Sequence, residues 1–196
     1  MKKFFTLLFA VTLVTTLVHA QTSSGNMMAG GTIDFNSRSR EGGSANDESN
    51  FTFAPSFGYF ISDNFAVGAS LTLGSGRSGT GAAKSTSSTF GIGPFARYYM
   101  FTSNESLGFF GQASVGLVTG KSDPAFGNVT HSSSITFALQ PGAAYFFNEH
   151  WAAELTIAGF TVNSYDGDTS TDNDKVTTVG FALSSLAPTL GFRYHF

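Results

Sequence analysis

The sequence contains no cysteine, few charges and no apolar run long enough to cross a membrane as a helix. Without cysteine, neither a disulfide framework nor a lipid anchor attached to a cysteine can form. Only 12% of its 196 residues are Asp, Glu, Lys or Arg, so its surface would be poorly solvated in water. The longest apolar run is about 15 residues, whereas a helix that spans a bilayer needs about 20. These absences exclude a disulfide-stapled domain, a cysteine-acylated lipoprotein and a bundle of transmembrane helices.

The first 20 residues have the pattern of a secretory signal peptide. The segment MKK is positively charged, FFTLLFAVTLVTTLV is apolar, and VHA places small residues at the offsets that cleavage requires. We therefore expect cleavage after Ala20, which leaves residues 21–196 as one domain. The alternative is an uncleaved membrane anchor, for which the apolar run is too short. Export without disulfides fits a protein of a bacterial envelope.

The charge balance excludes nucleic acid as a partner. The full chain has 10 Lys and Arg residues against 13 Asp and Glu residues. Removal of Lys2 and Lys3 with the signal peptide leaves 8 basic residues and a formal charge of 8 − 13 = −5. A domain that binds nucleic acid needs a basic surface, so we expect no such partner.

Hydrophobic residues alternate with small or polar residues along most of the remaining chain. In the segment FAVGASLTL, for example, Phe65, Val67 and Leu71 fall on one face of an extended strand and small or polar residues on the other. This period of two predicts β-strands. Turn residues separate eight such stretches, at 26–37, 49–61, 65–74, 87–101, 107–119, 133–147, 151–163 and 177–196.

The connections between these stretches are alternately short and long. The short ones lie at 62–64, 102–106 and 148–150. Short turns on one side, long polar loops on the other, and strands of at least the roughly 9–11 residues that cross a bilayer are typical of transmembrane barrels. The sequence therefore predicts an all-β fold, an eight-stranded antiparallel up-and-down transmembrane β-barrel. The long loops are rich in Ser, Gly, Asp and Asn and lie at 38–48, 75–86, 121–132 and 164–176.

A repeated pattern places aromatic residues at one end of this barrel. Pro stands four residues before an aromatic residue in PSFGYF, PFARYY, PGAAYF and PTLGFRY, each just ahead of a short turn or the end of the chain. The alternation along each strand puts these aromatic residues on the apolar face. We therefore expect an aromatic girdle, which includes Tyr59, Tyr98 and Tyr145, at the inner boundary of the membrane. Because Pro has no N–H to give to a ladder, we also expect a local bulge at each of these positions.

The chain ends in TLGFRYHF, in which Leu190, Phe192, Tyr194 and Phe196 fall on one face of a strand. With the signal peptide, the eight alternating stretches and the short turns, this ending resembles the small outer-membrane β-barrels of the OmpA transmembrane-domain and OmpX kind. The resemblance covers the whole chain after the signal peptide. It implies a place in the outer membrane of a Gram-negative bacterium, with both termini of the barrel in the periplasm.

The same resemblance implies partners and an assembly signal. In such families the barrel-assembly machinery reads a C-terminal Phe with alternating aromatic residues before it, and Phe192, Tyr194 and Phe196 match that pattern. The other implied partners are outer-membrane lipid and lipopolysaccharide. The four long loops are the surface through which a further partner could be contacted.

The polar residues of the inward face form the candidate site. Eight strands leave an interior wide enough only for side chains. We expect Glu154 and Arg193 to pair, because they lie near the periplasmic end of neighbouring strands, with Arg97 at a similar depth. Two interpretations stay open, namely a charge network that holds the barrel shut and a gate that re-pairs and passes small ions. The predicted inward set has two acids, two bases and two amides: Asp34, Arg97, Gln112, Gln140, Glu154 and Arg193.

Other motifs give only weak indications of chemistry. His131 and Ser133 resemble the His-x-Ser pair of outer-membrane deacylases, but the next acid downstream, Glu149, belongs to the opposite membrane face, so no triad is complete. Residues 165–175 carry four Asp without the spacing of a calcium loop, which leaves a solvated loop or weak divalent binding. We expect no catalytic residue, no cofactor and no metal site. Basic residues near the outer loops could contact lipopolysaccharide phosphates, namely Arg38, Arg40, Arg77, Lys84 and Lys121.

These patterns predict an integral outer-membrane barrel with a structural, envelope-integrity or surface-interaction role, and not an enzyme. The alternative from another class is a narrow porin-like channel for ions or small solutes. A third hypothesis is an enzyme that modifies lipid A, for which the sequence offers only the incomplete His-x-Ser pair.

Overall fold

A computed structural model describes residues 21–38, 47–79, 83–103, 106–167, 175–181 and 189–196. The expected signal peptide lies outside these residues, as do Arg40, most of loop 38–48 and three of the four Asp residues of segment 165–175. Apart from a short 3₁₀ turn at residues 21 and 22, the regular structure described is all strand. No helix in this part of the chain is long and apolar enough to span a membrane.

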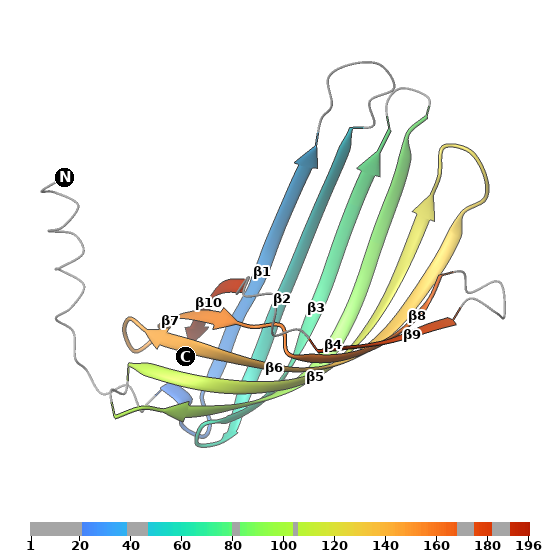
Figure 1. The fold of residues 1–196 in the computed structure, drawn as a ribbon. Coiled ribbons are helices and arrows are strands. Elements are labelled where there is room, and N and C mark those ends of the chain that lie inside the picture. The colour runs from blue at the N-terminus through green and yellow to red at the C-terminus, as the bar shows by residue number, and fades with distance from the viewer. Residues whose placement is uncertain (1–20, 39–46, 80–82, 104–105, 168–174, 182–188) are drawn as a thin grey trace, which may run out of the picture.

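The strands follow one another in antiparallel order around a closed ring (Figure 1). Each of β1 to β5 pairs with the next strand, β6 pairs with β7, β7 with β10, and β10 returns to β1. Eight strands therefore close the ring, which confirms the predicted eight-stranded antiparallel barrel. The strands are β1 (Met27–Arg38), β2 (Glu48–Ser62), β3 (Phe65–Ser78), β4 (Ser85–Phe101), β5 (Leu107–Asp123), β6 (Thr130–Phe146), β7 (Trp151–Thr156), β8 (Phe160–Asp166), β9 (Lys175–Phe181) and β10 (Thr189–His195).

The ring has two different ends. The short turns β2–β3, β4–β5 and β6–β7 lie at one end together with Gln21 and Phe196, and we call this the terminal end (Figure 1). The strand ends that the long connections join lie at the other end, which we call the loop end. In the β2–β3 turn, Asn64 has a φ of 65°, a left-handed conformation that Asn tolerates better than most residues. The alternation of short and long connections predicted from the sequence is thus present.

The predicted strand 151–163 is wrong in one respect, because it consists of two strands, β7 and β8. Thr156 pairs with Gly142, and Phe160 pairs with Leu139. Phe160 is four residues after Thr156, whereas their partners Gly142 and Leu139 are only three residues apart on β6. The break at residues 157–159 therefore contains one extra residue. An extra residue of this kind is a β-bulge, and it reverses which residues face inward.

Gly159 makes this bulge possible. A Cβ atom at this position would collide with the backbone carbonyl oxygen of Leu139 on β6. Any other residue would push the bulge away from β6. The backbone N–H of Ile157 then bonds to the carbonyl of Pro141 at 3.0 Å, so the bulge lies beside one of the four prolines of the repeated pattern.

The predicted strand 177–196 is also two strands, β9 and β10, and a single phase does not hold through both. In one continuous strand, Val179 and Phe181 would share the inward face with Arg193. Instead they are 65% and 67% exposed and pair with Val162 and Phe160. Seven residues, 182–188, separate the two strands and lie outside the described residues, so a period of two cannot be carried across them.

Among the described residues, the pairs that close the ring lie at the terminal end. β10 pairs with β1 over Met28–Gly31. Beyond that point, the described residues of β1 pair only with β2, and those of β9 pair only with β8. Towards the loop end, the described strands therefore form a sheet with two edges, β1 and β9, which diverge in Figure 1.

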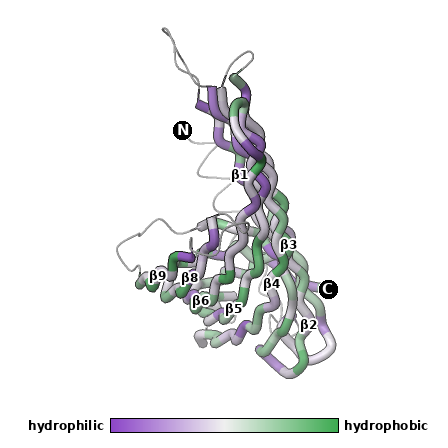
Figure 2. Tube along the Cα trace, turned by 90° about the vertical axis from the view of Figure 1, so that its right-hand side faces the viewer, coloured by the Kyte–Doolittle hydropathy of each residue, from purple (hydrophilic) through white to green (hydrophobic). Residues whose placement is uncertain are grey.

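The two faces of the ring differ in burial. Inside the terminal end, Met28, Phe60, Tyr99, Phe110 and Phe146 are almost fully buried and pack on one another. The outward face carries large apolar side chains that are about half exposed, and Figure 2 shows hydrophobic residues along the lower part of the strands and hydrophilic residues at their loop end. An apolar outward band of this kind is stable against lipid and not against water.

The prolines have the expected effect on pairing, but only one lies at a bulge. Between β2 and β3, pairing stops at Phe53 and resumes at Ser56 in the same register, so Pro55 is left out of this ladder. Between β4 and β5, Pro94 is left out in the same way. The expected bulges at these two positions are wrong, because a missing N–H removes a rung without inserting a residue. Pro141 does lie next to the β7–β8 bulge, and Pro188 falls outside the described residues.

Replacement of Gly159 by Ala is expected to lower the free energy of unfolding by about 1–3 kcal/mol, because the new methyl group overlaps the Leu139 carbonyl. The measurement is urea unfolding of the protein refolded in lipid vesicles, followed by the fluorescence of Trp151, the single tryptophan. Gly111→Ala is the control, since no atom lies within 4 Å of the added Cβ. Equal losses in the two variants would contradict the close approach of the bulge to β6.

Candidate functional site

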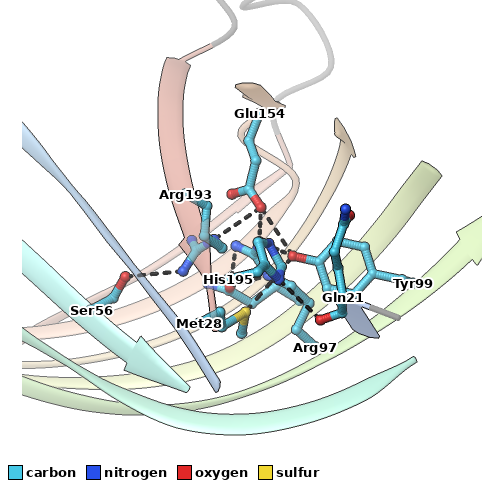
Figure 3. Close-up of polar contacts among 9 residues, drawn as sticks. Gln21, Met28, Ser56, Arg97, Tyr99, Glu154, Arg193 and His195 are labelled. Atoms are coloured by element: carbon cyan, nitrogen blue, oxygen red, sulfur yellow. Dashed lines mark hydrogen bonds and ion pairs between the residues drawn. The ribbon is translucent and has the colours of Figure 1, made fainter. Parts of the chain in front are cut away.

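Three charged side chains from three strands meet inside the terminal end of the ring (Figure 3). Arg97 on β4, Glu154 on β7 and Arg193 on β10 are only 3%, 4% and 8% exposed. Oε1 of Glu154 lies 2.6 Å from Nη1 of Arg97 and 2.9 Å from Nε of Arg193. One carboxylate oxygen thus accepts hydrogen bonds from two guanidinium groups. We call these residues the charge cluster.

Strand register brings the charge cluster together. Glu154 lies opposite Gly191 on β10 and Ala144 on β6, so small neighbours leave room for the two arginines. Arg193 lies opposite Ala152, two residues before Glu154 and on the same face of β7. Arg97 reaches the carboxylate from across the ring.

Arg97 has a partner for each of its guanidinium nitrogens. Nε and Nη2 donate to Oε1 of Gln112, at 2.9 and 2.7 Å. Nη1 donates to Glu154 and to the hydroxyl of Tyr99, at 2.6 and 3.0 Å. The guanidinium carbon also lies 4.1 Å from the centre of the Phe110 ring, close enough for a cation–π interaction. Arg97 is therefore held in one position.

Tyr99 links the charge cluster to the aromatic packing below it. Its hydroxyl donates to Oε1 of Glu154 at 3.0 Å, so the same oxygen accepts three hydrogen bonds. Its ring is fully buried and packs against those of Phe60, Phe110 and Phe146. Burial of a charged group is tolerated when such hydrogen bonds replace its hydration.

Asp34 does not join the charge cluster. It lies opposite Thr52 on the exposed part of β1, towards the loop end. The cluster therefore contains two cations and one anion, and the balance of two acids and two bases expected from the sequence is wrong. The alternation along a strand predicts which face a residue lies on, but not how far along the barrel axis it lies. Asp34 does face inward, but at a different depth from the charge cluster.

A cavity of about 350 Å³ lies against the charge cluster. Arg97, Glu154 and Arg193 are the charged residues that line it, and the remainder of its wall is mostly small or uncharged polar residues. Gln140 lies opposite Gln112 in the register of β5 and β6, and both line this cavity. The predicted residues Arg97, Gln112, Gln140, Glu154 and Arg193 are thus brought together around one space.

The first described residues occupy the terminal end of the ring. Gln21 and Thr22 are 2% and 1% exposed. Nε2 of Gln21 donates to the carbonyl of Asn148 at 2.7 Å, and the hydroxyl of Thr22 donates to Oδ1 of Asn64 at 2.6 Å. The Nδ1 atom of His195 lies 3.3 Å from the carbonyl oxygen of Gln21. The segment is therefore bound to two turns and to the last strand.

The predicted girdle residues lie on the outward face near the terminal end. Tyr59, Tyr98 and Tyr145 are 45%, 50% and 42% exposed. Each belongs to the last residues of its strand before a short turn, on β2, β4 and β6.

The aromatic residues of the C-terminus share that face. Phe192 and Phe196 are about half exposed. The ring of Tyr194 lies 5.0 Å from that of Trp151 and 5.8 Å from that of Phe196. The backbone of Phe196 exchanges two hydrogen bonds with Met27, at 2.7 and 2.9 Å, so the last residue is bound to the first strand.

His131 and Ser133 lie on the outward face of β6, in phase with Ile135. The sequence offered Glu149 as the next acid, but the structure places Asp166 of β8 directly opposite Ser133. Within the described residues, no hydrogen bond joins these three side chains, so the geometry of a nucleophile activated by a base is not present.

Two residues of the site were missed by reasoning from the sequence. Tyr99 shares the phase of Arg97, two residues earlier, and His195 shares that of Arg193. Both signals were available, because residues two apart on a strand face the same way. Neither belongs to the predicted inward set, because that set is limited to charged and amide side chains.

Replacement of Glu154 by Gln is expected to lower the free energy of unfolding by about 3–5 kcal/mol, because it leaves two buried guanidinium groups without a counter-charge. Urea unfolding in lipid vesicles, followed by Trp151 fluorescence, measures it. Glu48→Gln, which removes an exposed carboxylate at the loop end, is the matched control and should change stability by less than about 0.5 kcal/mol. A loss for Glu154→Gln no larger than the control's would show that the charge cluster does not stabilise the barrel.

Comparison with known proteins agrees with this architecture. The model of the outer membrane protein beta-barrel domain matches residues 6–185. Neisserial surface protein A (NspA) is 17% identical, with a TM-score of 0.50 over 88% of this chain and 98% of that one. The outer membrane protein OprG from Pseudomonas aeruginosa is 18% identical, with a TM-score of 0.51 over 90% and 98%. No curated protein matches the sequence. The protein is a bacterial outer-membrane protein, and its chain belongs to the family of the outer membrane protein beta-barrel domain.

Proposed function

We propose that this protein is a structural barrel whose interior is held shut by the charge cluster, and that it supports envelope integrity or contacts surface partners at its loop end. The observation that carries the proposal is the Glu154 oxygen that accepts hydrogen bonds from Arg97, Tyr99 and Arg193 while 4% of the residue is exposed. Separation of these groups would leave charges buried without partners, at a cost of several kcal/mol.

Two further layers support a shut interior. Below the charge cluster, the rings of Phe60, Tyr99, Phe110 and Phe146 fill the terminal end. Gln21 and Thr22 then cover these rings at the mouth of the ring. A solute that entered from the loop end would therefore meet a polar layer, an aromatic layer and a bound segment of the chain in turn.

The proposed placement follows the two ends of the ring. The terminal end lies in the periplasm, with Tyr59, Tyr98 and Tyr145 at the inner boundary of the membrane. Phe192, Tyr194 and Phe196 are the segment read by the barrel-assembly machinery, and residues 1–20 are removed as a signal peptide. The loop end contacts lipopolysaccharide and any surface partner, through the loops at 38–48, 75–86, 121–132 and 164–176. No catalytic step is part of this function.

Wild-type protein in liposomes is expected to give no solute-dependent swelling, because the charge cluster and the aromatic layer occlude the interior. Arg97→Ala removes the guanidinium group that contacts Gln112, Glu154, Tyr99 and the Phe110 ring, and it should produce measurable ionic conductance in planar bilayers. Arg38→Ala, at the loop end of β1, is the control and should remain closed. A steady, solute-permeable conductance in the wild type would overturn the proposal of a shut barrel.

A second candidate function is a narrow conduit for small anions. It is favoured by the cavity of about 350 Å³ and by the excess of one positive charge in the charge cluster that lines it. Such a charge attracts anions and repels cations in a space from which bulk water is excluded.

If the wild type does conduct, its reversal potential in a potassium chloride gradient is expected to show preference for chloride over potassium. Arg193→Gln should abolish this preference, since it leaves one cation and one anion in the charge cluster. A cation-selective wild type would exclude the second candidate, whatever its conductance.

A further inference from the structure

A hollow of about 460 Å³ lies on the outward face near the loop end. Two neighbouring rows of residues, defined by strand register, form most of its wall. One row runs through Phe35, Phe51, Ser75, Ser88 and Lys121 on β1 to β5, and the next runs through Ser49, Arg77, Thr86 and Asp123 on β2 to β5.

The shape of this hollow follows from the sizes of these side chains. Ser75 and Ser88 form a low floor in the middle of the first row. Phe35 and Phe51 stand on one side of this floor, and Lys121 stands on the other. Hydroxyl groups on the floor can donate hydrogen bonds to a ligand, so the hollow is polar at its base and flanked by aromatic rings.

The hollow carries unpaired positive charge. Arg77 and Lys121 are exposed, and neither makes an ion pair or a side-chain hydrogen bond with another described residue. Asp123 is the one acid in the wall, so the net charge of the hollow is +1. Arg77 and Lys121 are two strands and one row apart, so their backbones are about 12 Å from each other. Both side chains are long enough to reach one group bound between them.

The residues next to the hollow are apolar on the side that leads towards the terminal end. The adjoining row contains Ile33, Phe53, Leu73 and Phe90, which are 71%, 37%, 43% and 53% exposed. The row after it continues with Leu71, Ile92 and Leu117. A ligand in the hollow would therefore meet cationic and hydroxyl groups at one end and a hydrocarbon-compatible surface at the other.

We propose that this hollow binds the phosphorylated headgroup of an outer-leaflet lipid, with Arg77 and Lys121 on the phosphate and the acyl chains along the adjoining apolar rows. Cationic side chains next to hydroxyl donors recognise phosphate oxygens. The apolar rows select a lipid-borne phosphate over a free one, because only a lipid fills both parts of the surface. This inference rests on the proposed position of the loop end in the outer leaflet.

The test uses lipid A as the probe. The barrel is refolded in detergent micelles and titrated with bis-phosphorylated lipid A, and bound lipid is counted by native mass spectrometry. Arg77→Gln with Lys121→Gln is expected to weaken binding by at least tenfold, since each cation near an anionic lipid contributes about fivefold. Lipid A without phosphates should bind both proteins equally weakly, and inorganic phosphate should not compete.

Arg38→Gln with Lys175→Gln is the matched control, because it removes the same charge from the loop ends of β1 and β9, outside the hollow. Because both residues lie outside the hollow and contribute only to the general attraction of the loop end for an anionic lipid, this control should weaken lipid A binding much less than Arg77→Gln with Lys121→Gln does. Equal weakening in both double variants would mean that lipid A is attracted diffusely, and it would overturn the site. The site would also be overturned if the Arg77/Lys121 variant bound lipid A as the wild type does, or if inorganic phosphate displaced lipid A from the wild type. A heat-dependent gel shift establishes that each variant is folded.

This result is separable from the proposed function. Loss of the hollow leaves the charge cluster and its aromatic layer unchanged, so the double variant should remain closed in planar bilayers. If lipid A binding fails while the barrel is closed, the headgroup site is wrong and the structural proposal stands. If the wild type binds lipid A and also passes solutes, the shut barrel is wrong and the site stands.

Discussion

The pairing of β1 with β10 is the constraint on which the rest of the structure depends. In a membrane, an unpaired backbone N–H or C=O group costs several kcal/mol, so a sheet must close on itself. Here closure uses four residue pairs, from Met28 with His195 to Gly31 with Phe192, and the two backbone bonds between Met27 and Phe196. Arg193 belongs to this short ladder, so the rungs that close the ring also position one member of the charge cluster.

The charge cluster and the aromatic layer depend on each other. Glu154 can be buried because three donors surround one of its oxygens, and Tyr99 can donate because its ring is locked among Phe60, Phe110 and Phe146. The excess positive charge is spread over further partners, with Arg97 above the Phe110 ring and Arg193 3.3 Å from the hydroxyl of Ser56. Small residues opposite Glu154, namely Gly191 and Ala144, leave the space that this arrangement needs.

The sequence was sufficient for the features that depend on phase alone. A period of two placed Arg97, Glu154 and Arg193 on the inward face, and these residues do meet. The alternation does not predict how far along the barrel axis a residue lies, so the prediction that Asp34 joins these charged residues is wrong. It also fails where a strand is interrupted: one phase carried through 177–196 would put Val179 and Phe181 on the inward face, but both are exposed and pair with β8. The insertion at Gly159 depends on the approach of the Leu139 carbonyl, a contact between strands that local periodicity does not contain.

The binding of Gln21 to the mouth of the ring has a consequence for the order of assembly. Its carbonyl oxygen and the ring of His195 are 174 residues apart in the chain, and the entropic cost of bringing them together is met by the pairing of β1 with β10, in which Met28 lies opposite His195. Synthesis delivers Gln21 before β1 and His195 only with the last residue of β10. The contact between them can therefore form only after the strands between them are in place, so its presence indicates that these strands have been inserted.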